Sequence, residues 1–193
     1  MEHFKDLLTK EFAPFGALSD RQAELLQRHY ELLLQWNQRI NLTRITSLLD
    51  AVRYHYCESL YLAKYLPMEP LKIVDIGSGA GFPGIPVAVL RADCTLDLVE
   101  SHQRKSVFLS EVVRQLALPN VRVIAKRAEH IDAVYDWTIS RAVKSEDVLA
   151  YNLSLNTAIL GTVGEKLPWG ESRALFHVER LALTVPRETP RMV

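Results

Sequence analysis

The run Asp75-Ile-Gly-Ser-Gly-Ala-Gly-Phe-Pro-Gly84 decides the fold of this chain. The mostly apolar residues 71–76 lead into it and are typical of a buried strand, and residues 84–91, which follow Pro83, are typical of a helix. A strand, a glycine-rich turn and a helix start bring the backbone close to a nucleotide-like ligand and present free N–H groups to its anionic part. We therefore expect a ligand-binding site at this turn.

Two interpretations of the glycine spacing remain open. Counted from Gly79, the run matches G-x-G-x-x-G, the fingerprint of dinucleotide-binding folds. Counted from Gly77, which comes directly after the strand, it is Asp-x-Gly-x-Gly-x-Gly, which suits S-adenosylmethionine (SAM). The SAM carboxylate would then lie near the N–H groups of Gly77, Gly79 and Gly81, and Asp75 would accept a hydrogen bond from the SAM amino group, directly or through water.

Polar residues follow the next two predicted strands, at 95–99 and 121–125. Glu100 ends the first strand, and an acidic residue there accepts hydrogen bonds from both ribose hydroxyls of either cofactor. Ala128 and Glu129 follow the second, in a loop that lies beside the glycine loop in a doubly wound sheet. A backbone N–H and a polar acceptor there would contact adenine. On composition alone, a helix-start glutamate stabilised by the helix dipole explains Glu129 better.

The elements divide the chain into a helical part and an alternating part. Residues 1–66 show helical spacing only, whereas strands and helices alternate from residue 71, which predicts a parallel sheet with helices on both faces. We therefore expect a helical N-terminal extension at 1–66 and a Rossmann-like domain at 71–193, forming one compact unit. The predicted helices cover 1–12, 19–38, 47–66, 83–91, 102–116 and 146–153. Ser19 followed by Gln22 predicts a capping box at the start of the second, in which Leu26, His29 and Leu33 recur at helical spacing, and Ser47 with Asp50 predicts an N-cap for the third. The predicted strands cover 71–76, 95–99, 121–125, 137–140, 156–160, 174–181 and 182–186, with a loop at 161–170 and a closing antiparallel pair.

Composition narrows the function classes. The chain has 193 residues with 23 Lys and Arg against 23 Asp and Glu, so its formal charge is zero. This balance argues against a nucleic-acid binder that relies on bulk positive charge, but not against one whose partner supplies a docking surface. Cys57 and Cys94 lie far apart, which disfavours a disulfide framework, a zinc site and a covalent nucleophile. No signal peptide or membrane-length apolar run is visible, and the cysteine usage fits the reducing cytoplasm, so we expect a cytoplasmic protein. We expect no metal, and a monomer is the default expectation.

Several longer blocks resemble a known family. The blocks at 36–43 (Trp-Asn-Gln-Arg-Ile-Asn-Leu-Thr), 55–60 (His-Tyr-Cys-Glu-Ser-Leu) and 75–86 are similar to those of the bacterial small-subunit ribosomal RNA methyltransferase G family, also called glucose-inhibited division protein B. The resemblance continues to Ser140-Arg141-Ala142 and fades after about residue 145. It implies a class I SAM-dependent methyltransferase fold, doubly wound and mostly parallel, that methylates N7 of one guanosine in small-subunit (16S) rRNA within a ribosomal subunit or an assembly intermediate.

The resemblance also carries roles to matching positions. It implies that Gly77 and Phe82 contact the cofactor, that Ala128 and Glu129 form the adenine side, and that Arg141 lies at the cofactor or substrate. Guanine N7 has a free lone pair and no proton, so we expect no general base. Arg141 would instead position guanine O6 or a phosphate, while an ordinary ion pair at the sheet end is the structural alternative.

Exposed cations give a weaker signal. We expect Arg104, Lys105 and Arg127 to meet RNA phosphates, although a solvated face explains any one of them. The block at 36–43 contains Asn41, which we expect to cap a helix end or turn. We expect His55, Trp36 and Tyr56 to pack against neighbouring helices.

Two other functions remain open. The first is a SAM methyltransferase for a small molecule or a protein, with the helical segment as a lid. The second is a non-catalytic or NAD-binding Rossmann module. A dehydrogenase is disfavoured because little chain remains for a substrate domain after residue 150. The blocks before residue 70 favour the rRNA enzyme over a generic methyltransferase.

Overall fold

The computed structural model describes residues 3–45, 47–160 and 177–180. Its centre is a six-stranded sheet in the order β3-β2-β1-β4-β5-β6. The first five strands are parallel, and β6 runs antiparallel to β5. The predicted doubly wound, mostly parallel α/β fold is therefore confirmed. The strands are β1 (Lys72–Ile76), β2 (Thr95–Val99), β3 (Val121–Ile124), β4 (Tyr135–Arg141), β5 (Ser154–Leu160) and β6 (His177–Arg180).

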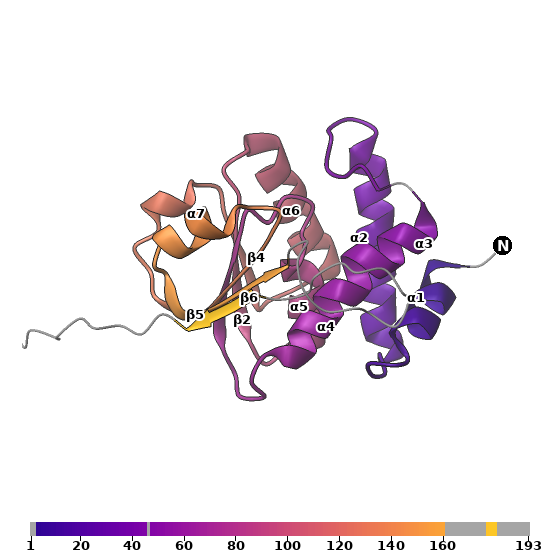
Figure 1. The fold of residues 1–193 in the computed structure, drawn as a ribbon. Helices are drawn as coiled ribbons and strands as arrows, with labels where there is room; N and C mark the ends of the chain where they lie inside the picture. The colour runs from indigo at the N-terminus through magenta and orange to yellow at the C-terminus, as the bar shows by residue number, and fades with distance from the viewer. Residues whose placement is uncertain (1–2, 46, 161–176, 181–193) are drawn as a thin grey trace, which may run out of the picture.

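The helices fall into an N-terminal group and a group that alternates with the strands. Figure 1 shows α1, α2 and α3 gathered on the side of the sheet away from α7. The N-terminal group comprises α1 (Phe4–Phe12), α2 (Asp20–Asn37), α3 (Leu48–Ala51), the π-helical segment η1 (Val52–Cys57) and α4 (Glu58–Tyr65). The second group comprises α5 (Gly84–Leu90), α6 (Gln103–Leu116), the 3₁₀ turn η2 (Ala128–His130) and α7 (Ser145–Ala150).

Local chemistry sets the starts of the N-terminal helices as predicted. The capping box at the start of α2 is present, because the Gln22 N–H donates to Ser19 Oγ while the Ser19 N–H donates to Gln22 Oε1. At α3, the Asp50 N–H donates to Ser47 Oγ in the same manner. The apolar face of α1 is buried, so the first predicted helix is also confirmed.

The predicted uninterrupted helix at 47–66 is wrong in one respect. Its middle turn, η1, is a π-helix, in which each hydrogen bond joins residues five positions apart instead of the four of an α-helix. A π turn uses the same residue types and nearly the same apolar spacing as an α turn, so the pattern could not reveal it. In this stretch Ser59 Oγ donates to the His55 carbonyl oxygen at 2.6 Å.

Other boundaries shift by a few residues. Helix α7 ends before the predicted residue 153, because Asn152 has a left-handed backbone with φ 48°. Strands β4 and β5 each begin two residues earlier than predicted. Part of the predicted strand at 174–181 is present as β6, whereas the predictions for 161–170 and 182–186 lie outside the described residues.

Both faces of the sheet are covered by apolar layers. On β1, Ile73 belongs to a large core that extends from Phe4 to Leu160, whereas Val74 and Ile76 belong to a smaller cluster. Successive residues of a strand point to opposite faces, so β1 is buried on both sides. The large core includes the N-terminal helices, which therefore pack on the same hydrophobic interior as the sheet. The division into parts 1–66 and 71–193 stays a prediction.

Candidate functional site

The glycine loop follows β1 at the carboxyl edge of the parallel strands. Its φ angles are 71° at Gly77, 54° at Gly79 and 89° at Gly81, which favour glycine at all three positions. A Cβ atom on Gly77 would lie 2.6 Å from Val143 Cγ2, whereas a Cβ on Gly79 would meet nothing closer than an oxygen at 3.6 Å. The loop is therefore closed against Val143 at Gly77 and open at Gly79.

Asp75 is buried beneath this loop with 0% of its surface exposed. Its Oδ2 accepts a hydrogen bond of 3.0 Å from the Gly84 N–H at the start of α5. Its Oδ1 has no hydrogen-bond partner among the described residues. Burial raises the pKa of Asp75 to about 7, although its hydrogen bonds oppose the shift. The orphaned oxygen is a candidate ligand contact, because buried polar atoms ordinarily have a partner.

Glu100 connects the glycine loop to α6. Its Oε2 accepts from the Gly79 N–H at 2.9 Å, and its Oε1 accepts from the His102 N–H at 2.7 Å. The residue is buried, so this bridge is shielded from solvent. Each oxygen of an ionised carboxylate has a second lone pair, so Glu100 retains acceptor capacity for a ribose.

The predicted adenine-side pair lies on η2, after β3. Ala128 is buried in the same apolar cluster as Ile76 and Val99, which end the two neighbouring strands. Glu129 is exposed and forms an ion pair of 3.4 Å with Arg127. The structure therefore brings Ala128 to the edge of the sheet that carries the glycine loop.

Arg141 lies at the end of β4 and is held by the helical segment. Its Nη1 donates to the Tyr54 carbonyl oxygen and its Nη2 donates to His55 Nδ1, each at 2.6 Å. The guanidinium carbon lies 5.0 Å from the centre of the Phe82 ring, and the His55 ring stacks on the same ring at 4.6 Å. Burial lowers the pKa of Arg141 to about 10, so it stays charged at neutral pH. Thr43 Oγ1 lies 2.8 Å from the other His55 nitrogen, Nε2.

His29 fixes the glycine loop from the other side, and the sequence analysis missed it. Its Nε2 donates to the Ala80 carbonyl oxygen at 3.0 Å, so in the neutral ring its Nδ1 accepts from the Tyr56 hydroxyl at 3.0 Å. Burial lowers the pKa of His29 to about 4, which keeps the ring neutral. Helical spacing placed His29 on a buried face, but no pattern indicated its partner Ala80.

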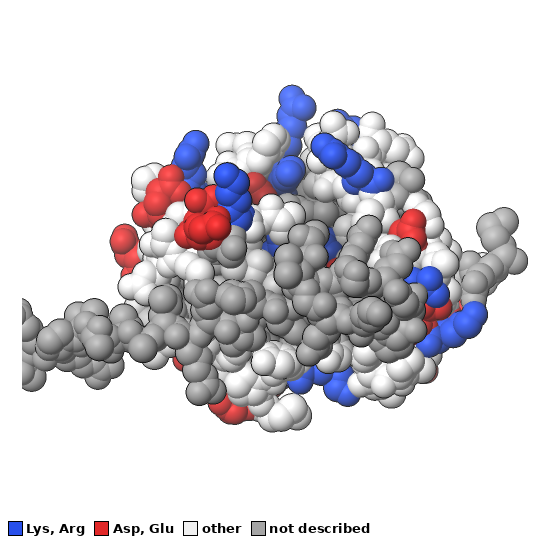
Figure 2. All heavy atoms as spheres, in the orientation of Figure 1, with Lys and Arg blue, Asp and Glu red and all other residues white. Residues whose placement is uncertain are grey.

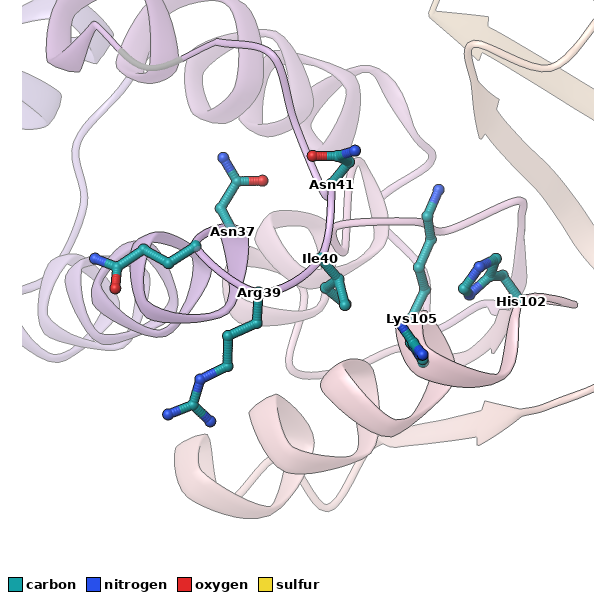
Figure 3. A pocket seen from close by; sticks show the side chains of 8 residues that line it. Asn37, Arg39, Ile40, Asn41, His102 and Lys105 are labelled. Carbon is teal, nitrogen blue, oxygen red and sulfur yellow. The ribbon is translucent and has the colours of Figure 1, made fainter.

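The predicted RNA-contacting cations separate into two places. Arg104 and Lys105 line a pocket with Arg39, whereas Arg127 lies outside it and pairs with Glu129. Figure 3 shows this pocket between the turn after α2 and the start of α6.

The turn beside this pocket corrects one expectation. Asn37 holds it, because its Oδ1 accepts from the Leu42 and Thr43 N–H groups and its Nδ2 donates to the Thr43 carbonyl oxygen. The predicted capping residue Asn41 lines the pocket instead. His55 and Tyr56 are buried and Trp36 packs against the core, as predicted.

Comparison with known proteins gives the family. The model of the rRNA small subunit methyltransferase G family matches residues 22–160, well over half of the chain. The chain belongs to this family. The match includes the helical blocks, the glycine loop and Arg141, so the resemblance found in the sequence is confirmed.

Curated relatives carry the rRNA small subunit methyltransferase G name. The protein of Chromobacterium violaceum is 45% identical over 127 residues, which are 65% of this chain and 60% of that relative. The protein of Nostoc punctiforme is 42% identical over 147 residues, covering 70% of this chain and 60% of the relative. The protein of Syntrophobacter fumaroxidans is 35% identical over 183 residues, covering 90% of this chain and 82% of the relative. The chain thus spans about 60% of the length of the first two.

Solved structures show the class of the fold. Magnesium protoporphyrin IX methyltransferase from Synechocystis, with bound SAM, superimposes with a TM-score of 0.51 and 14% identity, covering 75% of this chain and 76% of that one. A putative protein-L-isoaspartate O-methyltransferase from Plasmodium falciparum superimposes with a TM-score of 0.50 and 14% identity, covering 94% of this chain and 95% of that one. The fold is that of class I SAM-dependent methyltransferases.

Within residues 3–45, 47–160 and 177–180, no group of three or more His, Cys, Asp or Glu side chains is arranged to hold a metal ion. Over the same residues, the helices are too short or too polar to cross a bilayer.

Proposed function

We propose that this chain transfers a methyl group from SAM to N7 of a guanosine in small-subunit (16S) rRNA. The observation that carries the proposal is the family match across residues 22–160, because it includes both the helical blocks and the glycine loop. The blocks before residue 70 favour this function over a generic SAM methyltransferase, which has no evident need for them. An NAD-binding module is disfavoured for the same reason.

The residues around the glycine loop fit SAM. The N–H groups of Gly77, Gly79 and Gly81, which the sequence predicted to face the carboxylate, instead donate within the protein to Val99, Glu100 and Ser78. The carboxylate would therefore approach the loop at Gly79, which leaves open space where a side chain would stand. Asp75 Oδ1 is buried without a partner and would accept from the amino group. Glu100 has spare acceptor capacity for the ribose, and Ala128 with Glu129 would hold the adenine. Bound SAM supplies an electrophilic methyl group on a sulfonium.

The chain's own contribution is to place the guanine and exclude water. N7 carries a lone pair and no proton, so a general base is unnecessary. Arg141 supplies a partly buried cation beside the glycine loop, held by Tyr54, His55 and Phe82. A guanidinium has five N–H donors, so donors remain for guanine O6 or a phosphate. Such prior placement of a charge lowers the entropic cost of reaching the reactive geometry.

The setting of the reaction follows from charge and size. We place the substrate rRNA within a small subunit or an assembly intermediate, since a chain with zero net charge benefits from a partner that offers a docking surface. We place the protein in the cytoplasm as a monomer. We also propose that residues 1–66 act as an extension that shapes the substrate side of the domain at 71–193.

A methylation assay tests the proposal. Purified protein is incubated with methyl-labelled SAM and either small subunits lacking the modification or naked small-subunit rRNA. The expected result is N7-methylguanosine at a single position. Absence of label from both substrates, under conditions where SAM binds, would leave the small-molecule or protein methyltransferase as the better explanation. Binding of NAD without binding of SAM would favour the dinucleotide module.

A further inference from the structure

A pocket of about 330 Å³ lies between the turn after α2 and the first turn of α6. Figure 3 shows Arg39 and Asn41 on one wall, and His102 and Lys105 on the other. A water molecule takes up about 30 Å³ of liquid, so the space holds a group several times larger than a water. It is large enough for a phosphate with part of its sugar. None of the residues that line it belongs to the glycine loop.

The pocket has an excess of positive charge. Arg39, Arg104 and Lys105 line it, and none of its described lining residues is acidic. In the described part of the chain, the structure gives none of these three cations a carboxylate partner. Other arginines are neutralised by ion pairs, namely Arg28, Arg53, Arg91, Arg114, Arg122 and Arg127. In a chain with zero net charge, this pocket is a local concentration of unneutralised cations.

The surface around the pocket has the same character. Figure 2 shows Lys and Arg side chains along the upper edge of the molecule, where Figure 1 places one end of α6 and the loop after α2. Acidic side chains in this view gather mainly on the side of α7. An approaching polyanion would therefore be attracted to this edge.

Both walls are fixed before any ligand arrives. The turn is held by three hydrogen bonds of Asn37, at 2.9 to 3.0 Å. The opposite wall is anchored where the His102 N–H donates to Glu100 Oε1. This wall is also the N-terminus of α6, a helix of 14 residues whose first N–H groups favour an anion. Preorganised walls reduce the entropy lost on binding.

We propose that this pocket binds a backbone phosphate of the substrate RNA. The inference rests on the proposed function and adds an anchoring site outside the cofactor region. An RNA phosphate suits the pocket better than a free anion, because the space also accommodates part of a sugar. The Glu100 carboxylate connects Gly79 to His102, so the bound strand would lie beside the glycine loop. Phosphate contacts set the register of a strand, whereas base contacts identify it.

RNA affinity tests this proposal directly. Fluorescence anisotropy with a labelled transcript of small-subunit rRNA compares the wild type with the double variant Arg104→Gln/Lys105→Gln and with Arg39→Gln. We expect the double variant to bind about tenfold more weakly, as the loss of a charge-assisted phosphate contact predicts. The slope of log affinity against log salt should fall in magnitude by about 0.7, which corresponds to one single-strand phosphate. Arg39→Gln should show a smaller change in the same direction.

Matched controls separate the pocket from charge in general. Arg21→Gln removes an exposed cation from the first turn of α2, at the opposite end of that helix, and should leave RNA affinity unchanged. SAM affinity should be unchanged in every variant, because no substituted residue belongs to the glycine loop. The thermal denaturation midpoint should also be unchanged, because the three pocket cations have no carboxylate partner in the described part of the chain. A second titration uses inorganic phosphate alone.

The outcomes are distinguishable. Unchanged RNA affinity and salt slope in the double variant would overturn the proposal, as would a wild type without RNA affinity. A third result would also overturn the proposal: inorganic phosphate binds the wild type but not the double variant, while RNA affinity is unchanged. That result would identify a small-anion site. A wild type that binds RNA through the pocket but transfers no methyl group would contradict the proposed function and leave the phosphate site standing.

Discussion

The Nε2 atom of His29 lies 3.0 Å from the carbonyl oxygen of Ala80, which joins a helix of the N-terminal segment to the middle of the glycine loop. Tyr56 completes the arrangement by donating to the other ring nitrogen. All three residues are buried, so these hydrogen bonds form in a low-dielectric interior where an unpaired group is costly. The position of the glycine loop thus depends on the helices that precede it.

Substituting His29 should destabilise the protein. We expect His29→Ala to lower the free energy of unfolding by about 3 kcal/mol, because it opens a cavity and leaves the Ala80 carbonyl unpaired. Tyr56→Phe removes only the hydroxyl and should cost about 1–2 kcal/mol. Urea denaturation measures both. Equal losses in the two variants would argue against a separate contribution from the bond to Ala80.

Replacing Arg141 by lysine should also be costly. Lysine keeps the charge but cannot reach Tyr54 and His55 together or stack flat on Phe82, so we expect a loss of about 2–3 kcal/mol in thermal denaturation. Arg122→Lys is the matched control, since Arg122 pairs with Asp97 but its side chain is 66% exposed. It should cost less than about 1 kcal/mol. A loss as large in the control would contradict a special contribution from the contacts that hold Arg141.

The raised pKa of Asp75 predicts opposite pH dependences for folding stability and for SAM affinity. Its pKa in the folded protein is about 7 against the usual 3.8, so ionisation opposes folding. The stability that the neutral carboxyl provides is complete below pH 3.8 and is lost as pH rises through about 7. Relative to Asp75→Asn, wild-type stability should therefore fall by at most about 1.4 kcal/mol per pH unit over this range. The variant supplies the baseline, since every other titrating group is shared.

SAM binding should change in the other direction. The SAM amino group would bind the ionised Asp75, so wild-type affinity should rise as pH increases through about 7. In Asp75→Asn the rise should disappear. Isothermal titration calorimetry at several pH values measures both proteins. A parallel rise in the variant would assign the pH dependence to a different group.

The close approach of Gly77 to Val143 predicts that a second substitution restores the stability lost by the first. Gly77→Ala places a Cβ 2.6 Å from Val143 Cγ2, whereas Gly79→Ala meets no such contact although its φ is also positive. We expect Gly77→Ala to be the less stable of the two by about 1–3 kcal/mol. Adding Val143→Ala should restore most of that difference.

SAM titration extends the test to larger side chains. Gly79→Val should abolish SAM binding, because its side chain would stand in the open space assigned to the cofactor. Gly77→Val should lose binding because its side chain collides with Val143 and displaces the loop, and adding Val143→Ala should restore part of the affinity. Unchanged SAM affinity in a folded Gly79→Val protein would count against the assignment of the loop.

Sequence predicted the features that depend on neighbouring residues. The capping box of Ser19 and Gln22 and the strand–glycine–helix unit at 75–84 are local, and each carries its own chemical signal. The parallel direction of the strands followed from their alternation with helices. Glu100 was found because it directly follows a strand, although its bridge between Gly79 and His102 was not foreseen.

Contacts between distant residues could not be predicted in this way. Arg141 and His55 are 86 positions apart, and which face of η1 meets β4 depends on the packing of all the helices between them. The π-helical turn itself has no residue signature. The turn-capping role expected of Asn41 belongs to Asn37, because both are amides near a helix end and only the path of the turn distinguishes them.

The hydrogen-bond chain from Asn37 through Thr43 and His55 to Arg141 affects how the molecule unfolds. Peeling the helical segment from the sheet would leave the Arg141 charge without its partners and would expose the shared apolar core. Partial opening is therefore expensive, and the segment and the sheet should exchange their amide protons as one cooperative unit. If either part were transferred alone into another protein, it would lose the contacts that hold Arg141.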